Sequence, residues 1–188
     1  MMPSQIVGDS QDEVRRLADS GCVRIVGCGR WTMGDDQAGL RVARRLLDRN
    51  MAQVEFCLDE DPLNALVAQD CSASGLLIVV DAARADDRHP AGTFRRLNYA
   101  RERWSLELIS PLDTHQVSVA AGLELADRLH WLPREVWVYV LFGETFQRGV
   151  DISPALEDGI AELASRIEAD IVEWRGQRPC TSWRSSAP

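Results

Sequence analysis

The sequence predicts an α/β fold, a three-layer sandwich in which a mainly parallel, twisted sheet of about five strands has helices on both faces. Short runs rich in β-branched residues alternate along the chain with segments of helical periodicity. One of these runs, Leu76–Val80, is continuously apolar, as a strand covered on both faces requires. In such folds the functional loops gather at the carboxyl ends of the strands, which is where candidate site residues are sought.

In the first half of the chain, the expected elements are a short helix over 12–18, strands over 23–27, 53–58 and 76–80, a helix beginning near Asp35, and a short helix over 62–69. Asp35 and Asp36 suit a helix start, because carboxylates stabilise the unpaired N–H groups there. The helix that follows them carries one apolar stripe, formed by Leu40, Ala43, Leu46 and Leu47.

In the second half, the expected elements are weaker strands over 92–98 and 103–109, a helix over 115–129, a strand over 136–142 and a final helix up to Trp174. Ser153 is expected to cap the final helix, and Pro154 suits its first position. We therefore expect an N-terminal extension over 1–21, one domain over 22–174 and a flexible C-terminal tail over 175–188.

Composition excludes several classes of function. All 21 basic residues are arginines, so catalytic and phosphate-binding lysines are excluded, and the net charge of −8 argues against a nucleic-acid partner. No apolar run is long enough to cross a membrane, and residues 1–10 lack the layout of a signal peptide, so we expect a cytoplasmic protein. The five cysteines form no C-x-x-C pair and are expected to be free thiols.

Three residues able to bind a metal follow predicted strands. Asp36 lies after the first strand, Asp81 directly follows the run 76–80, and His115 begins the helix after the weak strand 103–109. Two carboxylates and an imidazole are a common ligand set for a divalent cation. Each residue also has an ordinary alternative role: Asp36 as a helix cap, Asp81 in a turn, and His115 at the surface.

The segment from Gly27 to Gly39, with its Gly-x-Gly turn, acidic pair and helix glycine, resembles the opening motif of the nickel–iron hydrogenase maturation endopeptidases. Segments 81–93, 110–123 and 143–154 resemble later motifs of that family in the same order, so the resemblance covers about 22–174. It implies that Asp36, Asp81 and His115 occupy the positions of the family's nickel ligands.

The sequence departs from the family pattern near the expected substrate cleft. Arg30 stands where the family usually has Asn, Asp36 where Glu is frequent, and the segment Cys57–Pro62 lacks the usual Asp-Gly-Gly-Thr turn. Asp59 is the closest match to that turn's aspartate. We expect Asp59 to contact substrate. Trp31, in the first loop, is a second candidate for a substrate contact, with packing in the core as its ordinary alternative role.

The resemblance implies a hydrolase that removes a short C-terminal extension from the nickel-loaded precursor of a [NiFe] hydrogenase large subunit. Catalysis would act through the metal, which the precursor supplies; Cys28 and Ser110 are unconvincing nucleophiles because no histidine partner is indicated. We expect a monomer with no nucleotide cofactor.

Two alternatives stay open. One is a non-proteolytic nickel-sensing or precursor-binding maturation factor, favoured by Arg30 and the missing turn glycines. The other is a dinucleotide-binding oxidoreductase, based on Gly27-x-Gly29 and a possible ribose contact at Asp59. The second is the weaker, because position 32 is Thr where the third glycine of that fingerprint belongs.

Overall fold

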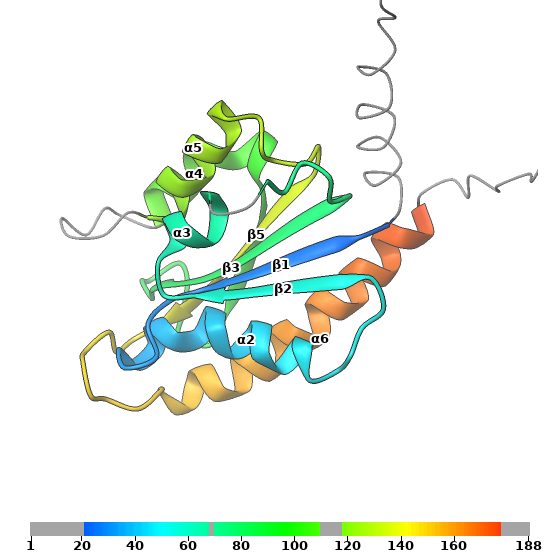
Figure 1. Cartoon of the computed structure of the whole chain (residues 1–188). Coiled ribbons are helices and arrows are strands. Elements are labelled where there is room, and N and C mark those ends of the chain that lie inside the picture. The colour runs from blue at the N-terminus through cyan, green and yellow to red at the C-terminus, as the bar shows by residue number, and fades with distance from the viewer. Residues whose placement is uncertain (1–20, 68–69, 110–117, 178–188) are drawn as a thin grey trace, which may run out of the picture.

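A computed structural model describes residues 21–67, 70–109 and 118–177 of the chain (Figure 1). The strands are β1 (Val23–Cys28), β2 (Val54–Asp59), β3 (Leu76–Arg84), β4 (Phe94–Asn98) and β5 (Val136–Gly143). The helices are the 3₁₀ turn η1 (Gly34–Gln37), α2 (Ala38–Leu47), α3 (Pro62–Val67), α4 (Tyr99–Ile109), α5 (Val119–Arg128) and α6 (Pro154–Gln177). The expected helix over 12–18 lies outside the described residues, as does His115.

The five strands form one sheet in the order β2-β1-β3-β5-β4. β1, β2, β3 and β5 are parallel, and β4 pairs antiparallel with β5 at one edge. The predicted mainly parallel sheet is therefore confirmed. From β1 the chain moves through α2 to β2 on one side and then through α3 to β3 on the other, so the strand order reverses between β1 and β3.

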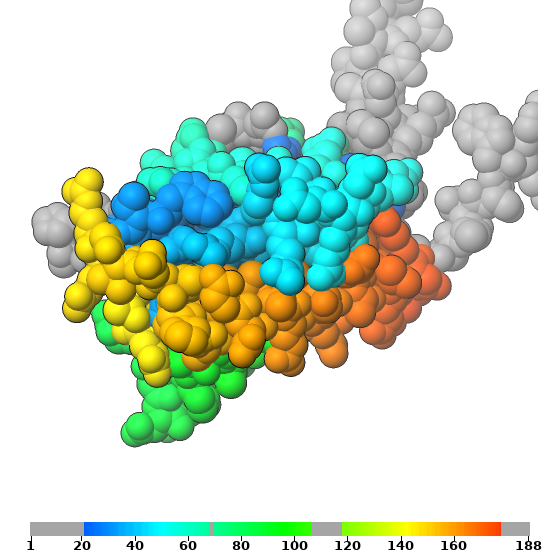
Figure 2. Space-filling view, turned by 90° about the horizontal axis from the view of Figure 1, so that it is seen from below, coloured from blue at the N-terminus to red at the C-terminus, as the bar shows by residue number. Residues whose placement is uncertain are grey.

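Helices cover both faces of the sheet, which confirms the predicted sandwich. Figure 1 shows α2 and α6 on one face and α3, α4 and α5 on the other. Seen from below, α2 and α6 lie side by side, and the yellow segment between β5 and α6 extends from one end (Figure 2). All eight residues of β5 are buried, as expected for a strand enclosed by two helical layers.

The apolar stripe predicted for α2 is correct at three of its four positions. Leu40, Ala43 and Leu46 are fully buried, whereas Leu47 is 40% exposed at the last turn of the helix. Val42 is buried as well, so the buried face of α2 is turned toward Val42 and away from Leu47. The cause is α6, which packs beside α2 on the side of Val42.

Two element predictions are wrong. Residues 103–109 belong to α4 instead of a strand: Leu106 is buried while Arg103 and Trp104 are exposed, which is a helical pattern. The Glu102 side chain also accepts the backbone N–H of Asn98 at 2.9 Å, which stabilises the start of this helix.

β3 also continues past Val80 as far as Arg84, because its last four residues pair with β5. Asp81 therefore lies within the strand. No helix in the described ranges is both long and apolar enough to span a membrane.

Candidate functional site

The candidate site lies where β1 and β3 separate, at the carboxyl ends of the parallel strands. The last residue pair between these strands is Gly27 with Val80, so Asp81 is the first residue of β3 that has no partner on β1. Asp36 lies in η1, immediately before α2. A crevice of this kind, where the strand order reverses, is the usual place for a ligand site in an open α/β sheet.

Two glycines allow the start of α2 to approach the strand ends closely. Gly29 has a φ of +130°, and a Cβ at this position would lie 1.8 Å from the backbone oxygen of Asp36. A Cβ at Gly39 would lie 2.3 Å from the backbone oxygens of both Cys28 and Val80. These glycines bring η1 against the ends of β1 and β3, which places Asp36 beside the exit of β3.

Asp36 is held by Arg30. The Asp36 Oδ2 atom accepts a hydrogen bond from Arg30 Nε at 2.6 Å and another from the backbone N–H of Arg30 at 3.1 Å. The two side chains are 16% and 25% exposed, respectively, so this ion pair is partly shielded from solvent. Within the described part of the chain, no hydrogen bond reaches the other carboxylate oxygen, Oδ1.

Asp81 has an electrostatic environment that disfavours its charged form. Burial raises the pKa of Asp81 to about 7, and the nearby Asp36 carboxylate acts in the same direction. The backbone N–H of Ala82 and the Arg30 guanidinium oppose this shift, but they do not cancel it. Asp36 and Asp81 are thus close enough to repel each other, and a cation between them would relieve that repulsion.

Asp35, the neighbour of Asp36, has a different role. Its side chain is completely buried, with Oδ2 accepting the backbone N–H groups of Glu144 and Thr145 at 2.7 and 2.9 Å. Its Oδ1 accepts the N–H of Ser153 at 2.7 Å. Asp35 therefore fastens the segment between β5 and α6 to the loop that carries Asp36.

Ser153 was expected to cap α6 with its hydroxyl group, and this is wrong. Its buried Oγ has no hydrogen-bond partner, while its backbone N–H is bound by Asp35. Pro154 does occupy the first position of α6, as expected.

The other predicted site residues surround the same edge. Trp31 is 44% exposed, and its backbone N–H lies 3.3 Å from Glu60 Oε1. Asp59 ends β2 opposite Cys28 and accepts the N–H of Asp61 at 2.9 Å, so it stabilises the turn into α3. In the ranges that the structure describes, no group of three His, Cys, Asp or Glu side chains is arranged to hold a metal ion.

The thiol at this edge is not a candidate nucleophile. Cys28 is completely buried at the end of β1, and burial raises its pKa well above the ordinary value, with the Asp81 carboxylate adding to the effect. The thiolate form is therefore disfavoured at neutral pH. Ser110, the other hydroxyl or thiol group considered as a nucleophile, lies outside the described residues.

Solved structures share this architecture. One is a [NiFe] hydrogenase maturation protease, HybD, from Thermococcus kodakarensis, with a TM-score of 0.64 and 16% identity over 80% of this chain and 99% of the other. Another is the hydrogenase maturating endopeptidase HybD from Escherichia coli, with a TM-score of 0.63 and 17% identity over 81% and 93%. The fold is that of the [NiFe] hydrogenase maturation proteases.

A third structure, an endopeptidase from Escherichia coli, matches with a TM-score of 0.68 and 19% identity over 81% of this chain and 93% of the other. A scan against protein-family models finds no match, and neither does a search of curated protein sequences. The maturation-protease likeness is therefore one of fold, while the identity of 16–19% leaves the activity to be tested.

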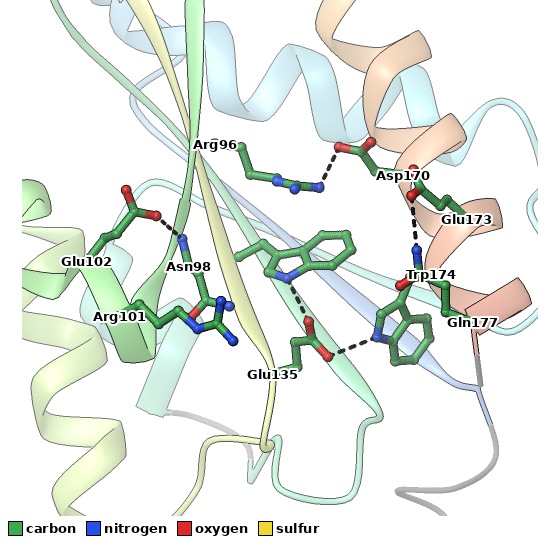
Figure 3. Close-up of a pocket in the computed structure, with 10 residues that line it drawn as sticks. Arg96, Asn98, Arg101, Glu102, Glu135, Asp170, Glu173, Trp174 and Gln177 are labelled. Carbon is green, nitrogen blue, oxygen red and sulfur yellow. Dashed lines mark hydrogen bonds and ion pairs between the residues drawn. The ribbon is translucent and has the colours of Figure 1, made fainter. Parts of the chain in front are cut away.

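A second polar region of this maturation-protease fold lies at the opposite end of the sheet. A cavity of about 580 Å³ opens beside the start of β5 and the last turns of α6 (Figure 3). Glu135 binds the indole N–H groups of Trp137 and Trp174, each at 3.1 Å, and so joins the strand to the helix. The cavity is far from the carboxyl ends of β1 and β3, because it borders the amino end of β5.

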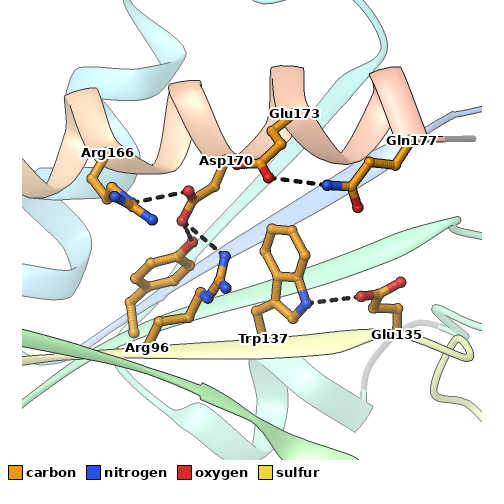
Figure 4. Close-up of polar contacts among 8 residues, drawn as sticks. Arg96, Glu135, Trp137, Arg166, Asp170, Glu173 and Gln177 are labelled. Carbon is orange, nitrogen blue, oxygen red and sulfur yellow. Dashed lines mark hydrogen bonds and ion pairs between the residues drawn. The ribbon is translucent and has the colours of Figure 1, made fainter.

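Asp170, which lines this cavity, is a buried carboxylate with three donors (Figure 4). It accepts the Tyr139 hydroxyl at 2.6 Å, Arg96 at 3.1 Å and Arg166 at 2.9 Å. Burial and the bond to Asp170 raise the pKa of Tyr139 far above its usual range. The sequence carried one signal of this cluster, an aspartate on the apolar stripe of the final helix between Ile167 and Trp174.

Proposed function

We propose that this protein is an endopeptidase that removes a short C-terminal extension from the nickel-loaded precursor of a [NiFe] hydrogenase large subunit. The observation that carries the proposal is the position of Asp36 and Asp81 at the strand-order reversal of a maturation-protease fold. The proteins that share this fold include a maturation protease and a maturating endopeptidase of hydrogenases.

The donor set fits a divalent metal carried by the substrate. Asp36 has a carboxylate oxygen without a hydrogen bond in the described residues, and Asp81 lies close enough for the two charges to interact. We propose that both bind the nickel of the precursor, with His115 as the third ligand. Nickel held there would polarise the scissile carbonyl or activate water.

The remaining residues would bind and orient the precursor. Trp31 offers an exposed indole beside the site, and Asp59 a carboxylate at the neighbouring strand end. The segment 144–153, between β5 and α6, would form one wall of the site, and Asp35 holds it in place through its three contacts with backbone N–H groups.

The test is intact mass spectrometry of the large-subunit precursor, nickel-loaded and nickel-free, before and after incubation with this protein. We expect loss of a C-terminal peptide from the loaded sample alone. Asp36→Asn, Asp81→Asn and His115→Gln should each abolish the trimming, while Asp48→Asn, an exposed change at the end of α2, should leave it intact. Trimming retained by all three site variants would contradict the proposed ligand set.

A second candidate function is a non-proteolytic factor that binds the nickel-loaded precursor. The ion pair between Arg30 and Asp36 favours it, because a carboxylate neutralised by a guanidinium is a poorer catalytic ligand. Complex formation with the loaded precursor, without any change in precursor mass, would establish this second function instead of the first.

A further inference from the structure

The Arg30–Asp36 ion pair places a positive charge inside the candidate metal site. Arg30 approaches the carboxylate twice, through Nε at 2.6 Å and through its backbone N–H at 3.1 Å, and both contacts reach Oδ2. Asp36 is the only ion-pair partner of Arg30 in the described residues. The Arg30 guanidinium thus lies against one oxygen of the Asp36 carboxylate, and its charge also acts on the nearby Asp81.

We propose that the Arg30 guanidinium takes the place of a metal ion beside Asp36 in the substrate-free protein. Its positive charge prevents free divalent ions from binding there until the bound precursor brings its own metal to the site. The part of this inference that names the precursor rests on the proposed function. The part that concerns free ions rests on the ion pair alone.

The physical reason is the balance of charges at the strand ends. Without Arg30, the carboxylates of Asp36 and Asp81 would lie together at one edge with Asp59 close by, and such a cluster attracts divalent cations. A guanidinium in contact with Asp36 removes one negative charge and repels an incoming cation at short range, where charges interact strongly.

The pair is also able to open. The Arg30 side chain is one quarter exposed, so its guanidinium can exchange the carboxylate for water, and partly exposed ion pairs contribute little net stability. For a metal already bound to the precursor, the contacts of the whole precursor with this protein would help to displace Arg30 from Asp36. A free ion would have only its own attraction to the carboxylates. The site would therefore discriminate between the two sources of metal.

Isothermal titration of the purified protein with nickel chloride tests this inference. The variants are Arg30→Gln, which removes the charge, and Arg30→Lys, which keeps it. Arg45→Gln is the matched control, because it makes the same change in net charge at an exposed position of α2. We expect Arg30→Gln to bind nickel at least about tenfold more tightly than the wild type, and Arg30→Lys and Arg45→Gln to bind it as weakly as the wild type.

The double variant Arg30→Gln/Asp36→Asn locates the added binding. The gain should disappear in it, because the ion then lacks the Asp36 carboxylate. The inference is overturned if Arg30→Gln binds nickel no better than the wild type, if the gain survives in the double variant, or if Arg30→Lys or Arg45→Gln shows the same gain. Failure of the wild type to trim the precursor would refute the proposed function without changing any of these titration results.

Discussion

Replacement of Asp35 by alanine is expected to lower the free energy of unfolding by about 3 kcal/mol. The side chain is completely buried and accepts the N–H groups of Glu144, Thr145 and Ser153. Alanine would leave these three donors without their acceptor, and no other acceptor for them is present in the described part of the structure.

The magnitude follows from the burial of each donor. The N–H of Ser153 is buried, and a buried donor left unsatisfied costs roughly 1–3 kcal/mol. The N–H groups of Glu144 and Thr145 are partly exposed, so water can replace the carboxylate and each loss is about 0.5 kcal/mol. For a domain of this size, a total near 3 kcal/mol corresponds to a fall in Tm of about 9 °C.

Urea unfolding followed by far-ultraviolet circular dichroism measures this loss. Asp36→Ala is the matched comparison, because it removes the adjacent carboxylate, whose side-chain contacts in the described residues are with Arg30 alone. We expect a loss below about 1 kcal/mol. The reasoning is refuted if Asp35→Ala costs less than about 1 kcal/mol, or no more than Asp36→Ala.

Three further predictions concern packing and ionisation. Gly39→Ala should lower the free energy of unfolding, measured in urea, by at least about 2 kcal/mol, since the new Cβ would meet two backbone oxygens. Gly176→Ala should leave it unchanged, since a Cβ there would meet no other atom. Tyr139→Phe should lower the free energy of unfolding by about 1–2 kcal/mol. Because folding raises the pKa of Tyr139 above the ordinary value of 10.0, the stability of the wild type should fall as pH rises past about 10, and the variant should lack that part of the fall. Iodoacetamide should leave Cys28 unmodified in the folded protein and label it after unfolding, as peptide mass mapping would show; labelling of the folded protein would contradict its burial.

The centre of the sheet was predictable because β1, β3 and β5 are enclosed. Runs such as Leu76–Val80 have to be apolar on both sides when helices cover both faces, and this requirement is visible in a single sequence. The α4 region was not predictable in the same way. Its amphipathic signal is weak, and tertiary contacts of Leu106 and the Glu102–Asn98 bond decide between helix and strand.

The positions of Asp36 and Asp81 at neighbouring strand ends were predictable, but the contacts of the residues around them were not. Asp35 and Asp36 are adjacent and chemically identical, so sequence alone does not tell which carboxylate turns inward to bind backbone N–H groups. The direction is set by η1, where one turn of 3₁₀ helix sends Asp35 toward Ser153 and Asp36 toward Arg30. The contact between Arg30 and Asp36 leaves no periodic pattern in the sequence, because it joins two residues of a loop instead of residues that repeat along a helix.

The final helix connects the two polar regions of the molecule. Its 24 residues form a rod about 36 Å long, with Asp35 bound at the residue before its first turn and Trp174 bound to Glu135 near its last. A displacement of the wall at 144–153 would therefore tilt or slide the indole at the far end. Trp174 therefore couples the polar cavity at one end of the molecule to the segment 144–153 at the other, through a single helix.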